Sequence, residues 1–389
     1  MPWRRTEPMN ERVHFISDCL KAKYEVSELC EAYGISRKTG YKWINRYKEQ
    51  GIEGLKEVSR RPHHSPYKTP ARIKKEIIEL RKRYGWGPKK LLSIMKNKHP
   101  TWHLPGRSTV CDMLNREGLI KKKRARRKIS AMHQPFSPVD KPNAVWAADF
   151  KGQFRIQHGR YCYPLTITDS YSRYLLECRA LTSTKMDGVK KVFKSIFEKY
   201  GLPERIRTDN GVPFAAMSAS GLSQLSLWWV RLGICPERID AGKPYQNGRH
   251  ERMHRDLKDK TVKPPAASMT AQQSRFDHFC KEYNEVRPHE ALHFKTPVSL
   301  YKLSNRVMPK KLTDFQYPEH YEVRHVQHQG MIYWRNSYVY AGYLLKDQPL
   351  GLDEIDNGIW DVYLGEFLLG RLFDEKMKID FNRKNIKKV

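Results

Sequence analysis

The sequence predicts a multidomain protein with α-helical modules at the N-terminus, an α/β domain in the middle and a small β-barrel at the C-terminus. Three observations carry this prediction. The chain has 389 residues, more than one ordinary hydrophobic core accommodates. Helical periodicity dominates its first third, whereas strands alternate with helices from residue 141. From residue 317, short strand-like runs are separated by Gly or Asn turns.

The first helical module, expected over residues 1–58, has the pattern of a helix-turn-helix. Gly34 suits the positive φ of a tight turn, and Ser36 suits the N-cap of the helix that follows. In such a motif the second helix enters the major groove of DNA. Its candidate DNA contacts are Arg37, Lys38, Thr39, Lys42 and Arg46. The residues expected to pack inward are Tyr41, Trp43 and Ile44.

A linker with three prolines, residues 59–70, precedes a second helical module over residues 71–120. Ser108 suits an N-cap there, and its neighbour Arg107 is a further candidate DNA contact. We interpret this module as a second helix-turn-helix or winged-helix-like domain, with a helical spacer as the alternative. The apolar positions that fit a three-helix core are Ile73, Ile77, Leu80, Leu91, Ile94 and Met95.

Residues 121–140 form a basic linker that begins with "KKKRARRK", seven basic residues in eight. Such a run repels itself too strongly to fold alone, but it is suited to lie along phosphates. A solvated tail is the alternative. The candidate phosphate contacts are Lys121, Lys122, Lys123, Arg124, Arg126 and Arg127.

The charge of the chain favours a polyanionic partner, and nucleic acid above all. The formal net charge is +31, and residues 1–130 hold 33 Lys and Arg against 13 Asp and Glu. A basic surface that serves only solubility is the alternative. The 7 cysteines are scattered singly without a C-x-x-C pair, which favours a reducing compartment over disulfides or a cysteine-based zinc module. No run of 18 apolar residues occurs, so we expect a cytoplasmic protein without a membrane partner.

Three carboxylates stand out in the α/β domain, which we expect over residues 141–305. Asp149 lies within the apolar strand "VWAADF", where a charge is costly unless it is paired or binds a cation. Asp209 follows the strand "RIRT", and Glu251 lies near the start of a helix. If neighbouring strands pair, the three converge. Carboxylate oxygens select Mg²⁺ or Mn²⁺ over Zn²⁺, and two such ions support in-line attack on phosphorus.

Four segments carry a family resemblance: "WAADFKG", "RTDNGVPF", "GKPYQNGRHERMHRDLK" and "YNEVRPHEALHFKTP". In their order and spacing, they resemble the catalytic core of the DDE transposases of bacterial insertion sequences, which are relatives of retroviral integrases. The resemblance implies an RNase H-like integrase core over residues 141–305, helix-turn-helix modules before it, and a small SH3-like β-barrel over residues 315–380. It also implies that Asp149, Asp209 and Glu251 are the catalytic and metal-binding triad.

The resemblance implies a function as well. Such a protein would bind the terminal inverted repeats of its own mobile element, cleave the 3′ ends in a metal-dependent reaction and transfer those ends into target DNA. Two ions of Mg²⁺ or Mn²⁺ per site, a dimer or larger homo-oligomer on DNA, and a place in the bacterial cytoplasm at the nucleoid are expected. The sequence identifies no helper protein. Arg255 and Lys258, on the helix of Glu251, would hold phosphates beside the metal ions.

Two rival hypotheses remain distinguishable. "HERMH" matches the zinc-protease pattern H-E-x-x-H through His250 and His254, but no H-x-x-G-x-x-H extension supplies a third ligand. We therefore expect both histidines to flank the DNA path. The other rival is a DNA-binding regulator with an inactive core, against which the presence of all three carboxylates argues. Asp169 is a possible fourth carboxylate, although a role in a turn is favoured.

Overall fold

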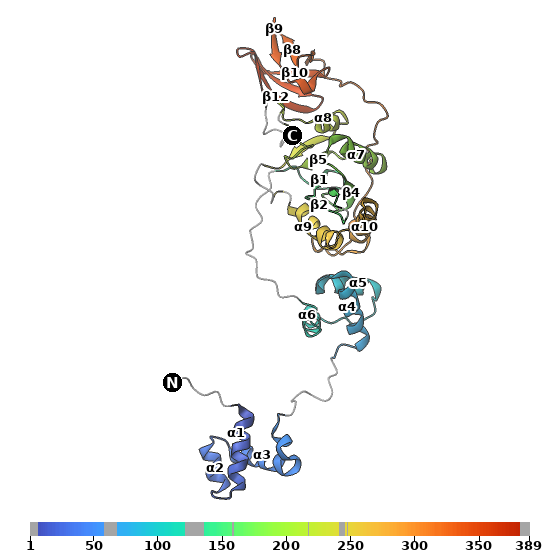
Figure 1. The fold of residues 1–389 in the computed structure, drawn as a ribbon. Helices are drawn as coiled ribbons and strands as arrows, with labels where there is room; N and C mark the ends of the chain where they lie inside the picture. The colour runs from blue at the N-terminus through green and yellow to red at the C-terminus, as the bar shows by residue number, and fades with distance from the viewer. Residues whose placement is uncertain are drawn as a thin grey trace. The chain divides into compact units, whose positions relative to one another are not determined.

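The computed structural model describes residues 7–57, 68–120, 136–157, 159–216, 218–240, 246 and 248–381. The chain divides into two compact units, Met1–Pro70 and Ala71–Val389, which we describe separately (Figure 1). The basic residues of the predicted linker from Lys121 to Arg127 lie outside the described residues.

The first unit contains three helices, α1 (Pro8–Leu20), α2 (Val26–Ala32) and α3 (Arg37–Gln50), and a short 3₁₀ turn, η1 (Gly51–Leu55). Gly34 has a φ of +62° in the turn before α3, and Ser36 Oγ caps α3 by accepting a hydrogen bond from the Thr39 N–H at 3.3 Å. These two local signals therefore place the start of α3 as predicted. The small core of the unit consists of Phe15, Ile16, Leu29, Cys30, Trp43 and Leu55.

One packing prediction for α3 is wrong. Trp43 is buried as expected, but Tyr41 is 52% exposed. The residue that faces α2 is Gly40 instead, where an added Cβ would lie 2.4 Å from Cys30 Sγ. The close approach of the two helices thus requires a glycine and turns the neighbouring Tyr41 outward.

The second unit begins with α4 (Ala71–Tyr84), α5 (Pro88–Lys98) and α6 (Arg107–Arg116). Gly106, and not Ser108, is the N-cap of α6, so the predicted start of this helix is two residues too late. Arg107 is exposed in the first turn of α6. The three helices enclose a core of their own, which includes Ile73, Ile77, Trp86, Leu91, Met95, Val110 and Leu114.

The central sheet has the order β2-β3-β1-β5-β6, with β4 paired to β3. The antiparallel part comes first in the chain, since β1 pairs antiparallel with β3 and β3 with β4. The parallel part follows, with β5 between β1 and β6. This is the mixed α/β sheet that the sequence predicts. Its strands are β1 (Val145–Phe150), β2 (Phe154–Arg155), β3 (Tyr161–Asp169), β4 (Leu175–Leu181), β5 (Arg205–Thr208) and β6 (Cys235–Arg238).

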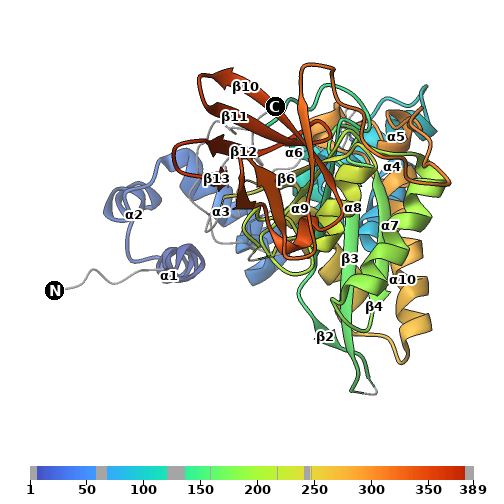
Figure 2. The same ribbon diagram turned by 90° about the horizontal axis from the view of Figure 1, so that it is seen from above.

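Helices cover both faces of this sheet (Figure 2). On one face, α7 (Met186–Tyr200) and α8 (Gln224–Arg231) pack on the apolar side chains of β1 and β3. On the other, α9 (Gly248–Leu257) and α10 (Met269–Lys281) pack on β3 and β4 through Met253 and Phe276. Alternation along the strands sends Trp146 and Ala148 to the first face and Asp149 to the second.

The C-terminal region is a five-stranded antiparallel sheet of order β13-β12-β11-β10-β7 and a separate hairpin, β8–β9. Within the described residues β7 and β13 remain its edges, so the predicted closed barrel is not confirmed. The apolar side chains of the hairpin, such as Ile332 and Trp334, instead bury against those of the sheet. The strands are β7 (Glu322–His325), β8 (Met331–Trp334), β9 (Ser337–Tyr340), β10 (Pro349–Asp356), β11 (Ile359–Leu364), β12 (Phe367–Phe373) and β13 (Lys378–Phe381).

Candidate active site

The parallel pair β1 and β5 brings two of the three predicted carboxylates together. The register pairs Val145 with Arg205 and Ala147 with Arg207. Asp149 therefore stands two residues beyond the last pair on β1, and Asp209 stands two residues beyond it on β5. The carboxyl ends of neighbouring parallel strands are the usual place for a binding site in an α/β sheet.

Burial and like charge act together on Asp149. Its pKa is raised to about 7, chiefly by burial, with the negative charge of Asp209 and, more weakly, that of Glu251 adding to the shift. Glu251 lies in the first turn of α9 and is exposed. The charges of Asp209 and Glu251 therefore act on Asp149 as one electrostatic cluster, although 102 positions separate the first residue from the last. Among the described residues, the group of three whose ligand atoms lie within 4.8 Å of one another is Asp149, His250 and His254, so the three carboxylates are farther apart than that.

A tight turn holds the Asp209 carboxylate. The Gly211 N–H donates a hydrogen bond to Asp209 Oδ1 at 3.0 Å. A Cβ at position 211 would lie 3.1 Å from Asp209 Oδ2, so a side chain there would crowd the carboxylate. Asn210 donates from Nδ2 to the Ile239 carbonyl oxygen at 2.9 Å and ties the turn to the segment after β6. The Asp-Asn-Gly sequence thus positions the carboxylate at the end of β5.

The prediction that His250 and His254 flank the DNA path is wrong, because the structure buries both side chains. Both are buried, at 2% and 5% exposed, on the side of α9 that faces β3. Their Nε2 atoms each lie 2.6 Å from Thr166 Oγ1. Burial lowers the pKa of His250 to about 3 and that of His254 further still, so both rings are neutral. They anchor the helix that carries Glu251.

The same contacts argue against the zinc-protease hypothesis. An H-E-x-x-H site needs a ring nitrogen of each histidine free for the ion. Here both Nε2 atoms are engaged by Thr166, and His250 Nδ1 lies 3.2 Å from Thr168 Oγ1. The nitrogen in ion-pair range of a carboxylate is His254 Nδ1, which lies 3.7 Å from Asp149 Oδ2.

Sequence reasoning missed Thr166 and Thr168. Both lie on β3, where Thr166 pairs with Asp149 across the antiparallel ladder. Their signal was the alternation of "LTIT", in which Leu165 and Ile167 enter the apolar core and the threonines face the other way. Alternation alone predicts a polar face. It does not reveal that buried histidines from α9, more than 80 residues later, cover that face.

Asp169, the possible fourth carboxylate, has the structural role that the sequence favoured. It is fully buried and accepts hydrogen bonds from the Asn143 N–H at 2.9 Å and from the Ser172 N–H at 2.8 Å. Its side chain therefore closes the turn between β3 and β4.

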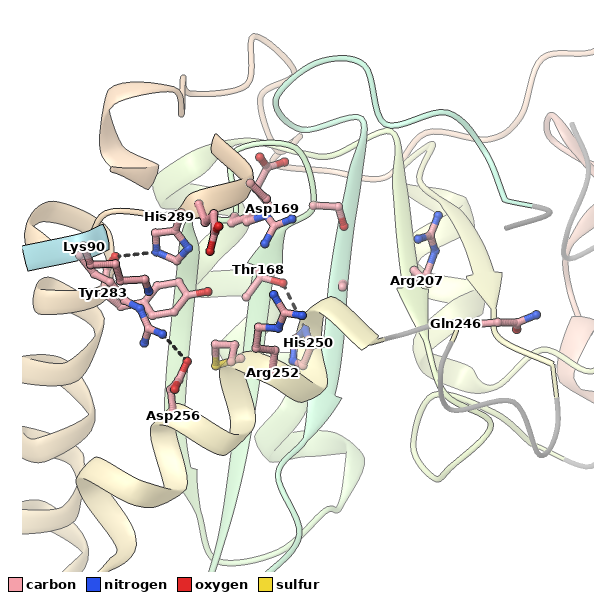
Figure 3. Close-up of a pocket in the computed structure, with 17 residues that line it drawn as sticks. Lys90, Thr168, Asp169, Arg207, Gln246, His250, Arg252, Asp256, Tyr283 and His289 are labelled. Atoms are coloured by element: carbon pink, nitrogen blue, oxygen red, sulfur yellow. Dashed lines mark hydrogen bonds and ion pairs between the residues drawn. The ribbon is translucent and has the colours of Figure 1, made fainter. Parts of the chain in front are cut away.

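A cavity of about 120 Å³ lies beside α9. Figure 3 shows the side chains that line it. Thr168 and His250 form part of its wall, and Asp256 and Arg287 form an ion pair at 2.5 Å in another part. Among the described residues that line it, none belongs to the carboxylate cluster. The cavity and the candidate active site therefore both lie beside the buried side of α9, but the three predicted carboxylates do not line the cavity.

The predicted DNA contacts that the structure describes are distributed over several helices. Arg37, Lys38 and Lys42 are exposed on α3, where the Lys42 ammonium also lies 4.6 Å from the Trp43 ring centroid. Thr39 and Arg46 are partly buried on the same helix. Arg255 is exposed on α9, and Lys258 is exposed at the start of the π-helical turn η3 (Lys258–Val262).

Comparisons with known proteins agree with this architecture. Two family models, each described as an integrase core domain, match residues 139–244 and 232–297. A helix-turn-helix domain model matches residues 11–63, and a homeodomain-like domain model matches residues 39–114. The chain therefore carries an integrase core behind helix-turn-helix sequence, which is the organisation that the resemblance implies.

Among similar proteins, an uncharacterized 31.7 kDa protein of insertion element IS407 from Burkholderia multivorans is 23% identical over 239 residues, covering 61% of this chain and 82% of that protein. The Gag-Pol polyprotein of woolly monkey sarcoma virus is 26% identical over 205 residues, which is 50% of this chain and only 11% of the polyprotein. A solved HTLV-2 integrase catalytic core domain in complex with magnesium is 14% identical and covers 42% of this chain and 98% of its own, with a TM-score of 0.33.

The domain matches show that parts of this chain are similar to integrase core domains and to helix-turn-helix domains. Together with the insertion-element relative, these matches confirm the predicted resemblance to the integrase-like proteins of insertion elements. No helix in the described part of the chain is long and apolar enough to cross a membrane.

Proposed function

We propose that the protein is a DDE polynucleotidyl transferase that binds the terminal inverted repeats of its mobile element, cleaves their 3′ ends and transfers them into target DNA. One observation carries the proposal. The negative charges of Asp209 and of Glu251 on α9 act on Asp149, and Asp149 and Asp209 stand beyond the paired ends of β1 and β5, inside a region that matches integrase core domains. We assign catalysis and metal binding to these three residues.

The donor set of the cluster fits Mg²⁺ or Mn²⁺. Three carboxylates offer hard oxygen ligands. The pKa of Asp149 is raised chiefly by burial and in part by the neighbouring negative charges, and a bound cation would offset both effects. We propose two ions per site. When bound, they would activate the attacking water or 3′ hydroxyl and stabilise the leaving oxygen.

The fold would hold the three carboxylates in fixed positions. Asp149 stands on a strand in the centre of the sheet, Asp209 is fixed by the Gly211 N–H, and Glu251 is held by a helix that the buried histidines anchor. Arg255 and Lys258, both exposed near Glu251 along the chain, would bind DNA phosphates. Fixed groups of this kind lower the cost of orienting the reacting atoms.

DNA binding outside the core is assigned to the helical modules and the basic linker. We propose a helix-turn-helix domain over residues 1–58, a linker over 59–70, a second such domain over 71–120 and a basic linker over 121–140. The integrase core spans 141–305, and the C-terminal domain spans 315–380. Handling two element ends requires at least a dimer, which would act on DNA in the bacterial cytoplasm.

A cleavage assay tests this function. Wild type and Asp209→Asn are incubated with end-labelled DNA that spans the flanks of the gene, in Mg²⁺ or Mn²⁺, and the products are separated on a denaturing gel. Asp187→Asn, which changes an exposed carboxylate on α7, is the matched control.

We expect nicked and joined products from wild type and from the control, and none from Asp209→Asn. Equal products from all three proteins would contradict the assignment of Asp209. If none of the three proteins cuts DNA that all of them shift on a native gel, the chain is a DNA-binding regulator and the proposed reaction is wrong.

A further inference from the structure

The two buried histidines of α9 converge on one hydroxyl group, and hydrogen-bond accounting fixes where their protons lie. Thr166 Oγ1 lies 3.0 Å from the backbone carbonyl oxygen of Asp149 and 2.6 Å from Nε2 of each histidine. A hydroxyl donates one hydrogen bond and accepts two. The carbonyl can only accept, so the Thr166 proton goes there and both Nε2 atoms donate to Oγ1.

This arrangement leaves a lone pair on each Nδ1 atom. For His250 the lone pair has a partner, because the Thr168 hydroxyl lies 3.2 Å from Nδ1 and can donate to it. For His254 the group that faces Nδ1 is the Asp149 carboxylate, with Oδ2 at 3.7 Å. That distance is too long for a hydrogen bond. Two electron-pair donors thus face each other in a largely buried place, an arrangement that a shared cation would stabilise.

We propose that His254 is a nitrogen ligand, through Nδ1, of a divalent metal ion bound by Asp149. Bonds of about 2.0–2.2 Å to each ligand allow two ligands of one ion to stand up to roughly 4.2 Å apart, so the spacing between Nδ1 and Oδ2 fits. The Nε2–H donated to Thr166 fixes the tautomer and the ring orientation, as a metal-bound histidine requires. The inference rests on the proposed function, because it assumes that Asp149 binds a cation.

His250 has no such role, although its ring is near. One ligand atom from each of Asp149, His250 and His254 lies within 4.8 Å of the others. However, both nitrogens of His250 are engaged by threonine hydroxyls, so its lone pair is not free for an ion. The two histidines therefore form a matched pair, because both are buried on one helix and they differ in that His254 Nδ1 lies 3.7 Å from an Asp149 oxygen.

A nitrogen ligand has a consequence for metal preference. Imidazole suits Mn²⁺ and the later transition metals better than it suits Mg²⁺, which prefers oxygen. The triad alone predicts a site of oxygen ligands. With His254 added, the site should discriminate more strongly in favour of Mn²⁺, and replacing the ring should reduce that discrimination.

Pulsed EPR of bound Mn²⁺ tests the proposal without any catalytic turnover, because a directly bound imidazole gives a ¹⁴N coupling. We expect this coupling in the full-length wild type and in His250→Asn, and its loss in His254→Asn and in Asp149→Asn. Wild type grown with ¹⁵N-histidine should show the ¹⁴N signal replaced by a ¹⁵N signal, so one arm needs no substitution of a buried residue.

The outcomes separate the inference from the function on which it rests. Mn²⁺ that binds in an Asp149-dependent way without any histidine coupling would overturn the role of His254 and leave the carboxylate site intact. Mn²⁺ binding that is unchanged in Asp149→Asn would overturn the carboxylate site itself. A coupling that persists in His254→Asn and disappears in His250→Asn would show that the wrong histidine was chosen.

Affinity gives a second readout. We expect His254→Asn to weaken Mn²⁺ binding on the order of tenfold and Mg²⁺ binding by less. The dissociation constant for Mg²⁺ divided by that for Mn²⁺ should therefore fall. An unchanged ratio in a folded variant, as judged by circular dichroism, contradicts nitrogen ligation.

Discussion

The two faces of the central sheet differ sharply although the same strands build them. Toward α7 and α8, β1 and β3 present Trp146, Ala148, Leu165 and Ile167, all of them buried in one apolar cluster. Toward α9, the same two strands present the residues that alternate with these apolar ones, and Asp149 and Thr166 are among them. A strand alternates its side chains, so a single residue step separates the two environments.

The two faces have different roles: the apolar face stabilises the fold, and the polar face holds carboxylates that repel one another. The apolar face orders the strands by burial alone, which is not directional. On the polar face, Thr166 and Thr168 engage the buried ring nitrogens of α9, whereas the carboxylates repel one another. Changes on the apolar face should therefore have the larger effect on folding stability. Changes on the polar face should affect chemistry, metal binding or pH dependence and, at the threonines that hold α9, stability to a smaller extent.

The largest expected effect is on activity. Glu251→Gln keeps the size of the side chain but removes a charge from the cluster, so DNA cleavage should fall on the order of 1000-fold, as expected for the loss of several kcal/mol of metal-assisted stabilisation. The fold should be unchanged because Glu251 is exposed. Cleavage rates on labelled DNA measure this, with Glu198→Gln on α7 as a control that should cut normally. Activity that survives in Glu251→Gln would remove this residue from the site.

Next in size is the apolar face. Trp146→Ala removes a fully buried ring that packs on Phe197 and whose Nε1–H donates to Asn143 Oδ1 at 3.0 Å. The free energy of unfolding should fall by about 3–5 kcal/mol, as measured by chemical denaturation. Tyr41→Ala, at an exposed site on α3, should change it by less than about 0.5 kcal/mol. Equal effects of the two changes would show that the apolar face does not hold the core together.

On the polar face, titration of Asp149 should make the stability of the protein depend on pH. In the folded chain the pKa of Asp149 is raised from 3.8 to about 7, so the folded state keeps a proton that the unfolded state loses. Metal-free protein should therefore lose stability as pH rises from about 4 to about 7, by up to roughly 4 kcal/mol. Asp149→Asn should lack this loss.

Melting temperatures of both proteins across that pH range provide the measurement. The gap in favour of Asp149→Asn should widen up to pH about 7 and then stay level, and added Mn²⁺ should narrow it by stabilising wild type alone. Parallel curves for the two proteins would mean that folding does not raise the pKa of Asp149.

A smaller effect is expected at the threonine bridge. Thr166→Val keeps the shape of the side chain but leaves two buried ring N–H groups without their acceptor, which should cost about 1–3 kcal/mol of stability. Ser183→Ala, beyond β4, is the control, and denaturant titration measures both. Should Thr166→Val be as stable as wild type, the histidine protons do not point at Thr166.

The smallest effect concerns DNA contacts far from the sheet. Arg37→Ala and Lys38→Ala change exposed residues at the start of α3 and should weaken binding to the element ends without changing the fold. If each residue contacts one phosphate, the slope of log affinity against log salt should decrease by about 1 per substitution. An unchanged slope would exclude phosphate contact. Glu49→Ala, exposed near the end of α3, serves as the control.

Local chemistry made several features predictable from the sequence. Ser36 caps α3 because its hydroxyl can accept a hydrogen bond from a backbone N–H that has no partner within the helix. Asp149 was recognisable because a charge within an apolar strand is costly unless it is paired or binds a cation. Order and spacing of short segments then indicated the integrase core. These signals are carried by neighbouring residues, so one sequence suffices to recognise them.

Long-range packing limited the rest. The inward direction of Tyr41 was wrong because the approach of α2 to α3 favours Gly40 at the contact, and the closed barrel is not confirmed because a hairpin can cover a sheet without joining its edges. The burial of His250 and His254 depends on threonines in a strand far back in the chain. No local pattern reports such a contact.

The most direct test of the central claim, that three carboxylates form one metal site, is Mn²⁺ binding to the full-length chain, measured from the loss of the free-ion EPR signal. Asp149→Asn, Asp209→Asn and Glu251→Gln are compared with wild type and with Asp187→Asn. We predict that each of the three weakens Mn²⁺ binding while Asp187→Asn does not. Wild-type affinity in all three variants would contradict the account, since the carboxylates would then lie together without binding the ion.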